Sequence, residues 1–298
     1  MSLIKLNNNV KKIVNVYQLE FVNKKSPGFG DFLRGCFFVR QLSKILNIDF
    51  ELDISNHPIS NYIINNGKNE NINYNNINWI TGLNRPDPNI VSFSTNPPNN
   101  KYIDINYVNQ IISNMNKTEN EVFALFTNSF PIYYNFADEG REFMKSKLIP
   151  NDIISKYIDD SLNKLTLTKN SYAVIHIRTG DNSLTTKSVE ISIINKIKNI
   201  INKIIVPEKN YLIISDNNCI KLIFNNKSNC YFNITKIEHL GGEINSNKNI
   251  AGIKNTMLDF FLMSYSNYIL SMSIYDHISG FSKHCSEIYK IPFVNIKL

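Results

Sequence analysis

The sequence predicts an α/β protein whose second half forms a doubly wound parallel sheet. In residues 166–298, short apolar runs typical of buried strands alternate with longer amphipathic segments typical of helices. Residues 13–54 begin in a similar way, with a strand, a glycine-containing turn, a helix and a second strand. Such alternation favours parallel strands joined by helices, so we expect a parallel sheet in the second half.

The first half opens with regular elements and then becomes irregular. Phe32, Cys36 and Val39 begin an apolar stripe at three- and four-residue spacings, which predicts a helix. Residues 65–100 are rich in asparagine and proline, and we expect irregular surface structure there. Strands are expected at residues 13–21, 50–54 and 121–127, and helical segments at 31–46 and, interrupted at Pro150, within 143–165.

The second half is more regular, and the polar stretch before it marks a boundary near residue 165. We therefore expect domains at residues 1–165 and 166–298. Strands are expected at residues 172–177, 211–214, 231–234, 268–270 and 293–296, and helices at 189–204, 219–224, 253–265 and 279–289. Ligands of doubly wound sheets bind at the carboxyl ends of strands, so polar residues that follow strands are the candidates for a site.

Composition bounds the possible partners. The chain has 298 residues, 43% of them hydrophobic, and a net charge of +7. Residues 166–298 hold 15 basic and 9 acidic side chains, so most of the excess lies there. That charge suits nucleic acid, an acidic membrane surface or a phosphorylated small molecule. The four cysteines show no metal-ligand spacing, no apolar run has the length of a membrane span, and we expect an intracellular soluble protein with reduced thiols.

The turn before the first helix is a candidate anion site. It reads Gly-Phe-Gly-Asp-Phe-Leu-Arg-Gly at residues 28–35. Gly28 and Gly30 allow positive φ and close backbone approach, and a helix N-terminus offers N–H groups to an anion. Arg34 follows one turn into the helix. Asp31 is also a good N-cap, and this structural role explains it equally well.

The second candidate is His-Ile-Arg-Thr-Gly-Asp at residues 176–181, where a buried strand runs into polar residues. His176 and Arg178 share one face of the strand because side chains alternate. Arginine suits a diphosphate through its forked donors, and histidine can bind a base, a ribose or a phosphate. The alternative is a satisfied core histidine with a structural Arg178–Asp181 pair.

Two further groups follow later strands. Asp216 lies in Ser-Asp-Asn at residues 215–217, where a helix N-cap is the structural alternative. Ser279, Phe281 and Ser282 lie where a late helix opens, and their hydroxyls and N-terminal amides could hold phosphate oxygens. Ser279 as an ordinary cap is the alternative there.

These motifs, in this order, resemble the fucosyltransferases, a group that includes the α-1,2 and α-1,6 fucosyltransferases and the protein O-fucosyltransferases. The resemblance spans nearly the whole chain and implies a GT-B-like fold of two Rossmann-like domains. It places the acceptor side in residues 1–165 and a GDP-sugar in residues 166–298. Thr179-Gly180 stand where relatives often carry a second arginine, and Asn217 where many carry a second acidic residue, which leaves the sugar and the acceptor open.

The resemblance also implies roles for individual residues. Arg178 would pair with the donor β-phosphate, His176 would face the nucleoside or phosphate, and Asp216 would lie near the guanine or ribose. The other donor-site candidates are Asp181, Ser279, Phe281 and Ser282, with Gly28, Gly30, Asp31 and Arg34 reaching the cleft from the other domain.

Physical chemistry agrees with this implied reaction. Breaking the bond between a sugar and a nucleoside diphosphate builds negative charge on the β-phosphate, and a fixed cation such as Arg178 stabilises that charge. The chain has no Asp-x-Asp pair to hold a metal, so we expect an inverting, metal-independent glycosyltransferase with Asp31 as base and no cofactor beyond its GDP-sugar substrate. We expect a glycan or protein acceptor and no nucleic acid. The alternative is a nucleotide-sugar or glycan-binding module of the same fold without transfer activity.

Overall fold

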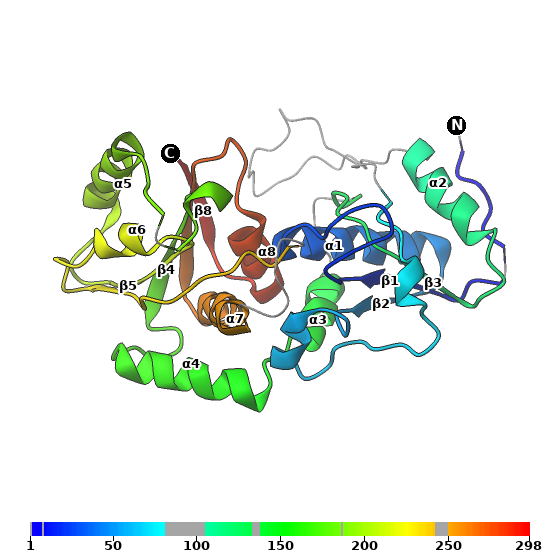
Figure 1. Ribbon diagram of the computed structural model, residues 1–298, viewed down its shortest axis with the longest axis horizontal. Coiled ribbons are helices and arrows are strands. Elements are labelled where there is room, and N and C mark those ends of the chain that lie inside the picture. The colour runs from blue at the N-terminus through cyan, green and yellow to red at the C-terminus, as the bar shows by residue number, and fades with distance from the viewer. Residues whose placement is uncertain (1, 8, 81–104, 133–137, 186, 242–249) are drawn as a thin grey trace. The chain divides into compact units, whose positions relative to one another are not determined.

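The computed structural model describes all residues except 1, 8, 81–104, 133–137, 186 and 242–249 (Figure 1). The chain forms two compact units. The first consists of Met1–Ser60, Asn65–Leu148 and Gly241–Glu243, and the second of Asn61–Ile64, Ile149–Leu240 and Ile244–Leu298.

The first unit contains a parallel sheet of three strands in the order β2-β1-β3. Its strands are β1 (Lys12–Val16), β2 (Asp49–Asp53) and β3 (Val122–Leu125), and its α-helices are α1 (Phe29–Leu46), α2 (Ile105–Met115) and α3 (Asp138–Lys147). Short 3₁₀ turns are formed by η1 (Pro58–Tyr62) and η2 (Tyr74–Asn76). Helix α1 connects β1 to its parallel neighbour β2 and buries its apolar stripe, as the spacing in the sequence predicts.

A glycine permits α1 to approach the end of β3. A Cβ atom at Gly35 would lie 1.7 Å from the backbone oxygen of Thr127. Only glycine fits at this distance, so Gly35, the last glycine of the 28–35 motif, serves helix packing.

The second unit contains a five-stranded parallel sheet in the order β6-β5-β4-β7-β8. The strands are β4 (Tyr172–Arg178), β5 (Asn210–Ser215), β6 (Cys230–Tyr231), β7 (Tyr268–Ser273) and β8 (Phe293–Lys297). The helices are α4 (Asp152–Lys164), α5 (Ile191–Ile204), α6 (Asn218–Leu222), α7 (Ile250–Ser264) and α8 (Gly280–Tyr289). Figure 1 shows α5 and α6 on one side of this sheet and α7 and α8 on the other. The chain first builds outward from β4 through β5 and β6 and then returns to β7, so the strand order reverses between β4 and β7.

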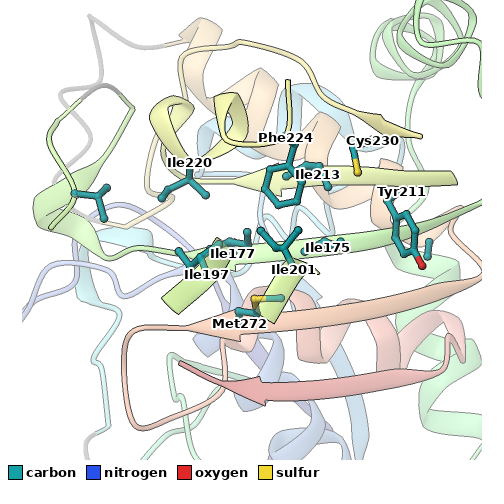
Figure 2. Packing of buried hydrophobic residues seen from close by; sticks show 12 residues of the cluster. Ile175, Ile177, Ile197, Ile201, Tyr211, Ile213, Ile220, Phe224, Cys230 and Met272 are labelled. Atoms are coloured by element: carbon teal, nitrogen blue, oxygen red, sulfur yellow. The ribbon is translucent and has the colours of Figure 1, made fainter. Parts of the chain in front are cut away.

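The two faces of β4 have different roles. Ile175 and Ile177 point into an apolar cluster with Ile197 and Ile201 of α5 (Figure 2). These four side chains are at most 1% exposed, and each such burial stabilises the unit by roughly 1.5–3 kcal/mol. Because side chains alternate along a strand, the polar residues of β4 face the opposite side, toward α7 and α8.

The predicted fold class is confirmed, since the structure contains two α/β units with parallel sheets. The units divide between Leu148 and Ile149, earlier than the boundary expected near residue 165, because α4 packs against α7 and so lies with the second unit. The roles expected for the two domains stay predictions. Residues 81–100, part of the region where we expect irregular structure, lie outside the described residues.

The sequence analysis missed α2, although its buried residues recur at helical spacing. They are Tyr107, Val108, Ile111, Ile112 and Met115. The high asparagine content of this part of the chain hid the helical period of these apolar residues.

Each of the four cysteines is a free thiol, and Cys36, Cys230 and Cys285 are buried. None of the helices that the structure describes has the length and apolar character needed to cross a bilayer.

Candidate functional site

The candidate site lies at the carboxyl edge of the second sheet. Arg178 ends β4 and pairs in register with Ser273, which ends β7. Asp216 follows β5 directly. The strand order reverses between β4 and β7, and such a switch point is where doubly wound sheets leave a crevice for ligands.

Arg178 and Asp216 form an ion pair in which Nη1 donates to Oδ2 at 2.6 Å. The side chains are 17% and 6% exposed. Asp216 also accepts hydrogen bonds from the Thr179 backbone N–H at 2.8 Å and from the Thr179 hydroxyl at 2.8 Å, both at Oδ1. Because charge-assisted bonds of this length are strong, Asp216 fixes the position of the guanidinium.

The turn after β4 is shaped around the same carboxylate. Gly180 has φ +92°, a conformation that favours glycine, and its N–H donates to Asp216 Oδ2 at 3.1 Å. Asp181 begins the 3₁₀ turn η4 (Asp181–Ser183) immediately afterwards. Its backbone therefore lies at the predicted edge of the sheet, and its expected contact with a ligand stays a prediction.

The structure changes the interpretation of Asp216. The N-cap of α6 is Asn217, whose side chain accepts from the Cys219 and Ile220 N–H groups, so the capping alternative for Asp216 is wrong. Its carboxylate oxygens are engaged by β4 and the turn that follows. Asp216 is thus placed to position Arg178, and its expected contact with guanine or ribose stays a prediction.

His176 lies deeper on the same face of β4. Burial and the adjacent Arg178 charge lower its pKa to about 3, so the imidazole is neutral near pH 7. Its ring lies 6.0 Å from that of Phe281, between centroids. Its Nδ1 atom is buried and has no hydrogen-bond partner among the described residues. The alternative of a satisfied core histidine is therefore wrong, and the unpaired buried nitrogen remains open to a bond from a ligand or a water molecule.

The start of α8 supplies the other predicted residues. Ser279 is the N-cap but makes no side-chain capping bond, so the ordinary-cap alternative does not account for its hydroxyl. Ser282 is fully buried, and its hydroxyl lies 2.9 Å from that of Ser271 on β7. Ser282 therefore anchors α8 to the sheet, while Ser279 and the first N–H groups of α8 offer donors at its end.

Asp259 on α7 is a site candidate that the sequence pattern did not single out. It is 8% exposed, and burial raises its pKa to about 6 against the lowering effect of the Lys221 charge. Among the described residues, no hydrogen bond to this carboxylate is found. The signal in the sequence was an acidic residue inside the apolar run Met-Leu-Asp-Phe-Phe-Leu-Met. A largely buried carboxylate without a hydrogen bond is costly, so Asp259 becomes a candidate for contact with a ligand.

Lys221 of α6 is a buried cation whose pKa responds to the charges of Asp259 and Asp216. It is 1% exposed, and its Nζ donates to the Asn233 carbonyl at 3.0 Å. Burial lowers its pKa, while the charges of Asp259 and Asp216 raise it. The ammonium thus lies within electrostatic reach of both carboxylates.

The remaining predicted residues lie in the first unit. Gly28 is the N-cap of α1 with φ −66°, and Gly30 lies within the helix, so neither uses positive φ as expected. Asp31 lies in the first helical turn, which makes the N-cap alternative wrong, and it pairs with Arg34 at 2.8 Å. Arg34 Nε also donates to the Asn128 carbonyl at 2.6 Å. These two side chains stabilise the unit locally, and their expected contacts with a ligand stay predictions.

Several of the predicted site residues of the second unit follow strands of its sheet or open α8. Arg178, the Ser279 hydroxyl and the first N–H groups of α8 offer donors, while His176 offers a ring nitrogen and Asp259 a carboxylate. No group of three or more metal-ligating side chains occurs among the described residues. Such an arrangement suits a ligand with a phosphate at one end and a polar ring at the other.

Comparisons with known proteins fit this geometry. No family model matches the chain, and no curated protein matches it in sequence. Among solved structures, the fucosyltransferase NodZ from Bradyrhizobium matches with a TM-score of 0.56 and 10% identity, over 96% of this chain and 95% of that one. NodZ α-1,6-fucosyltransferase co-crystallised with GDP gives 0.54, also at 10% identity and with the same shares covered.

A plant structure agrees. A mutant of Arabidopsis thaliana FUT1 in complex with GDP matches with a TM-score of 0.52 and 8% identity, over 98% of this chain and 71% of that one. The resemblance found in the motifs is confirmed at the level of the fold: the chain has the two-unit α/β fold of the fucosyltransferases NodZ and FUT1.

Proposed function

We propose that the chain is a fucosyltransferase that moves fucose from GDP-fucose to a hydroxyl of a glycan or protein. The observation that carries the proposal is the Arg178–Asp216 pair at the switch point of the second sheet. A fixed guanidinium at this edge suits a diphosphate. Solved NodZ structures with GDP and GDP-fucose, which share the fold, support this choice of donor.

The reaction needs stabilisation of a leaving group. As the bond between the sugar and the β-phosphate breaks, charge develops on the phosphate, and Arg178 with the N–H groups at the start of α8 stabilises it. These donors replace a metal in the proposal. A single displacement by the acceptor hydroxyl inverts the anomeric centre, and Asp31 stays our proposed base for that hydroxyl.

The guanine base of the donor gives a role to two groups that make no hydrogen bond in the structure, the Asp259 carboxylate and His176 Nδ1. Guanine presents N1–H and an exocyclic amino group as donors, which the Asp259 carboxylate can accept, and neutral His176 can bond another polar edge of the nucleoside. Adenine lacks this pair of donors. We therefore propose that Asp259 selects guanine and that His176 supports the choice.

Calorimetric titration tests the donor. GDP and GDP-fucose should bind without added metal, and ADP and UDP should bind at least tenfold more weakly. Arg178→Ala should weaken GDP by about 10- to 100-fold, since it removes a charge-assisted bond, and Arg178→Lys should recover part of the loss. The control is Lys198→Ala, which removes one exposed charge from α5 and should leave GDP binding unchanged. Equal affinity for the three nucleoside diphosphates would overturn the proposal.

Asp259→Asn gives a sharper test of base selection. The amide keeps one acceptor and adds a donor, so it matches xanthine, whose O2 replaces the guanine amino group. The variant should bind xanthosine diphosphate better than GDP, a reversal that mere unfolding cannot produce. Retained preference for GDP would contradict the role of Asp259.

Turnover distinguishes a transferase from a binding module. Release of GDP from GDP-fucose in the presence of a glycan or glycoprotein mixture should persist in EDTA, and the product anomer should be inverted. GDP-fucose binding without any transfer would instead favour the binding module.

A further inference from the structure

The chain that follows β7 crosses directly in front of β4. The Ile274 N–H donates to the Arg178 carbonyl at 3.1 Å, which extends the pairing of the two strands by one residue. The next N–H, that of Tyr275, donates to the Ser273 hydroxyl at 3.1 Å. The β7–α8 connection is therefore fixed at the switch point, beside the proposed phosphate site.

Tyr275 lies over the backbone of Gly180. A Cβ atom at Gly180 would come within 2.7 Å of the Tyr275 hydroxyl and 3.2 Å of its Cζ atom. Glycine is thus required for the phenol to take this place as well as for the positive φ. Because the Gly180 N–H donates to Asp216, a single peptide unit separates the Arg178–Asp216 pair from the tyrosine ring.

A second ring stacks on the first. The rings of Tyr275 and His277 lie 5.1 Å apart between centroids with planes inclined by 12°. Both residues are exposed, Tyr275 at 38%. An exposed stacked pair combines flat apolar faces with a hydroxyl and an imidazole at its rim. A sugar ring has the matching chemistry, with C–H groups on one face and hydroxyls around its edge.

The order of residues along β4 matches the order of groups in a nucleotide sugar. His176 is buried, Arg178 lies two residues further along, and Gly180 with Tyr275 lies two residues beyond that. The first step is about 6.6 Å along the strand, and the second leads from the end of β4 into the turn at Gly180. The buried end suits the base, the middle suits the diphosphate, and the exposed end is left for the sugar.

We propose that Tyr275 and His277 form the binding surface for the sugar of the donor and determine which sugar is accepted. This inference rests on the proposed function and deepens it. Tyr275 stacks on the sugar and offers its hydroxyl, and His277 holds the tyrosine ring in place and borders the same surface.

The test compares the affinities of GDP and of GDP-fucose in each variant. Tyr275→Ala should remove the extra affinity that fucose gives, by about fivefold to tenfold in the ratio of the two dissociation constants, while GDP alone stays within about twofold. Tyr275→Phe keeps the ring and should retain most of the ratio. His277→Ala should lower it less than Tyr275→Ala. The preference for GDP-fucose over GDP-mannose should fall in the same variants and in the same order.

A matched control is Tyr157→Ala, which removes another exposed tyrosine, 41% exposed on α4, from the same unit. In this variant, the ratio of the dissociation constants for GDP and GDP-fucose should equal that of the wild type. An unchanged ratio in Tyr275→Ala, an equal loss for GDP and GDP-fucose, or a wild type that binds both equally would overturn the inference. An unchanged ratio with weaker acceptor use would assign the surface to the acceptor instead. If the wild type fails to bind GDP at all, the proposed function itself is wrong.

Discussion

Arg178 and Asp216, 38 residues apart in the chain, meet at 2.6 Å where β4 and β5 end. The carboxylate also accepts hydrogen bonds from the N–H groups of Thr179 and Gly180. One acidic side chain thus fixes both the cation of the candidate site and the turn that follows it. Breaking a pair of this kind leaves a buried charge and unsatisfied N–H groups.

Asp216→Asn should therefore destabilise the protein. We expect the free energy of unfolding to fall by about 2–4 kcal/mol, measured by urea denaturation followed by circular dichroism. The control is Asp159→Asn, which removes an exposed partner of Lys169 at 3.5 Å and should cost less than about 1 kcal/mol. Similar losses in the two variants would argue against the central role of Asp216.

Binding of GDP should depend on the ionisation of Asp259, whose pKa burial raises to about 6. The proposed contact needs the carboxylate, so affinity should be constant above pH 7 and fall by up to about tenfold per unit below 6. Titration calorimetry from pH 5 to 8 measures this. The Asp259→Asn variant reports what the phosphates contribute to the same profile, and a profile identical to the wild type would remove Asp259 from base recognition.

His176 should make the unliganded protein sensitive to mild acid. Its pKa is lowered to about 3 in the fold, mainly by burial, while the unfolded chain has the ordinary value of 6.5. The unfolded state then binds the proton first, so stability is fully present above pH 6.5 and is lost as the pH falls toward 3.

The His176→Gln variant isolates this effect. Between pH 7.5 and 5, the wild type should lose about 2 kcal/mol more unfolding free energy than the variant. Urea denaturation at the two pH values gives both differences. Equal losses would show that the imidazole takes up its proton in the folded state.

Two helical glycines should respond in opposite ways to alanine. At Gly35, the added Cβ would lie 1.7 Å from the Thr127 oxygen, so Gly35→Ala should destabilise the first unit by about 3 kcal/mol or more. At Gly140 on α3, nothing lies within 4 Å of the added atom, so Gly140→Ala should be neutral or stabilising by up to about 1 kcal/mol. Thermal and urea denaturation would compare them, and a stable Gly35→Ala protein would show that α1 can move away from β3.

Much of the fold could be predicted from local patterns. The helices α1, α5 and α8 and the strands β4, β5, β7 and β8 occur where apolar spacing predicts them, because the period of an amphipathic element depends on neighbouring residues. The strand expected at residues 231–234 is instead the two-residue β6 at Cys230–Tyr231. The order of the strands is not local. This order places β4 between β5 and β7. Arg178, Asp216 and the start of α8 therefore lie at the same carboxyl edge of the sheet.

The sequence by itself determined the alternation of elements and the positions of the polar motifs that follow strands, since both depend on residues close together in the chain. Tertiary structure alone decided which hydrogen-bond partners these polar side chains have. Asp216 accepts a hydrogen bond from Arg178 of β4, and Asn217 caps α6. Asp259 makes no hydrogen bond among the described residues, and His176 Nδ1 is buried without a hydrogen-bond partner. Whether a polar group is satisfied depends on which distant segments pack around it, and a linear pattern does not contain that information.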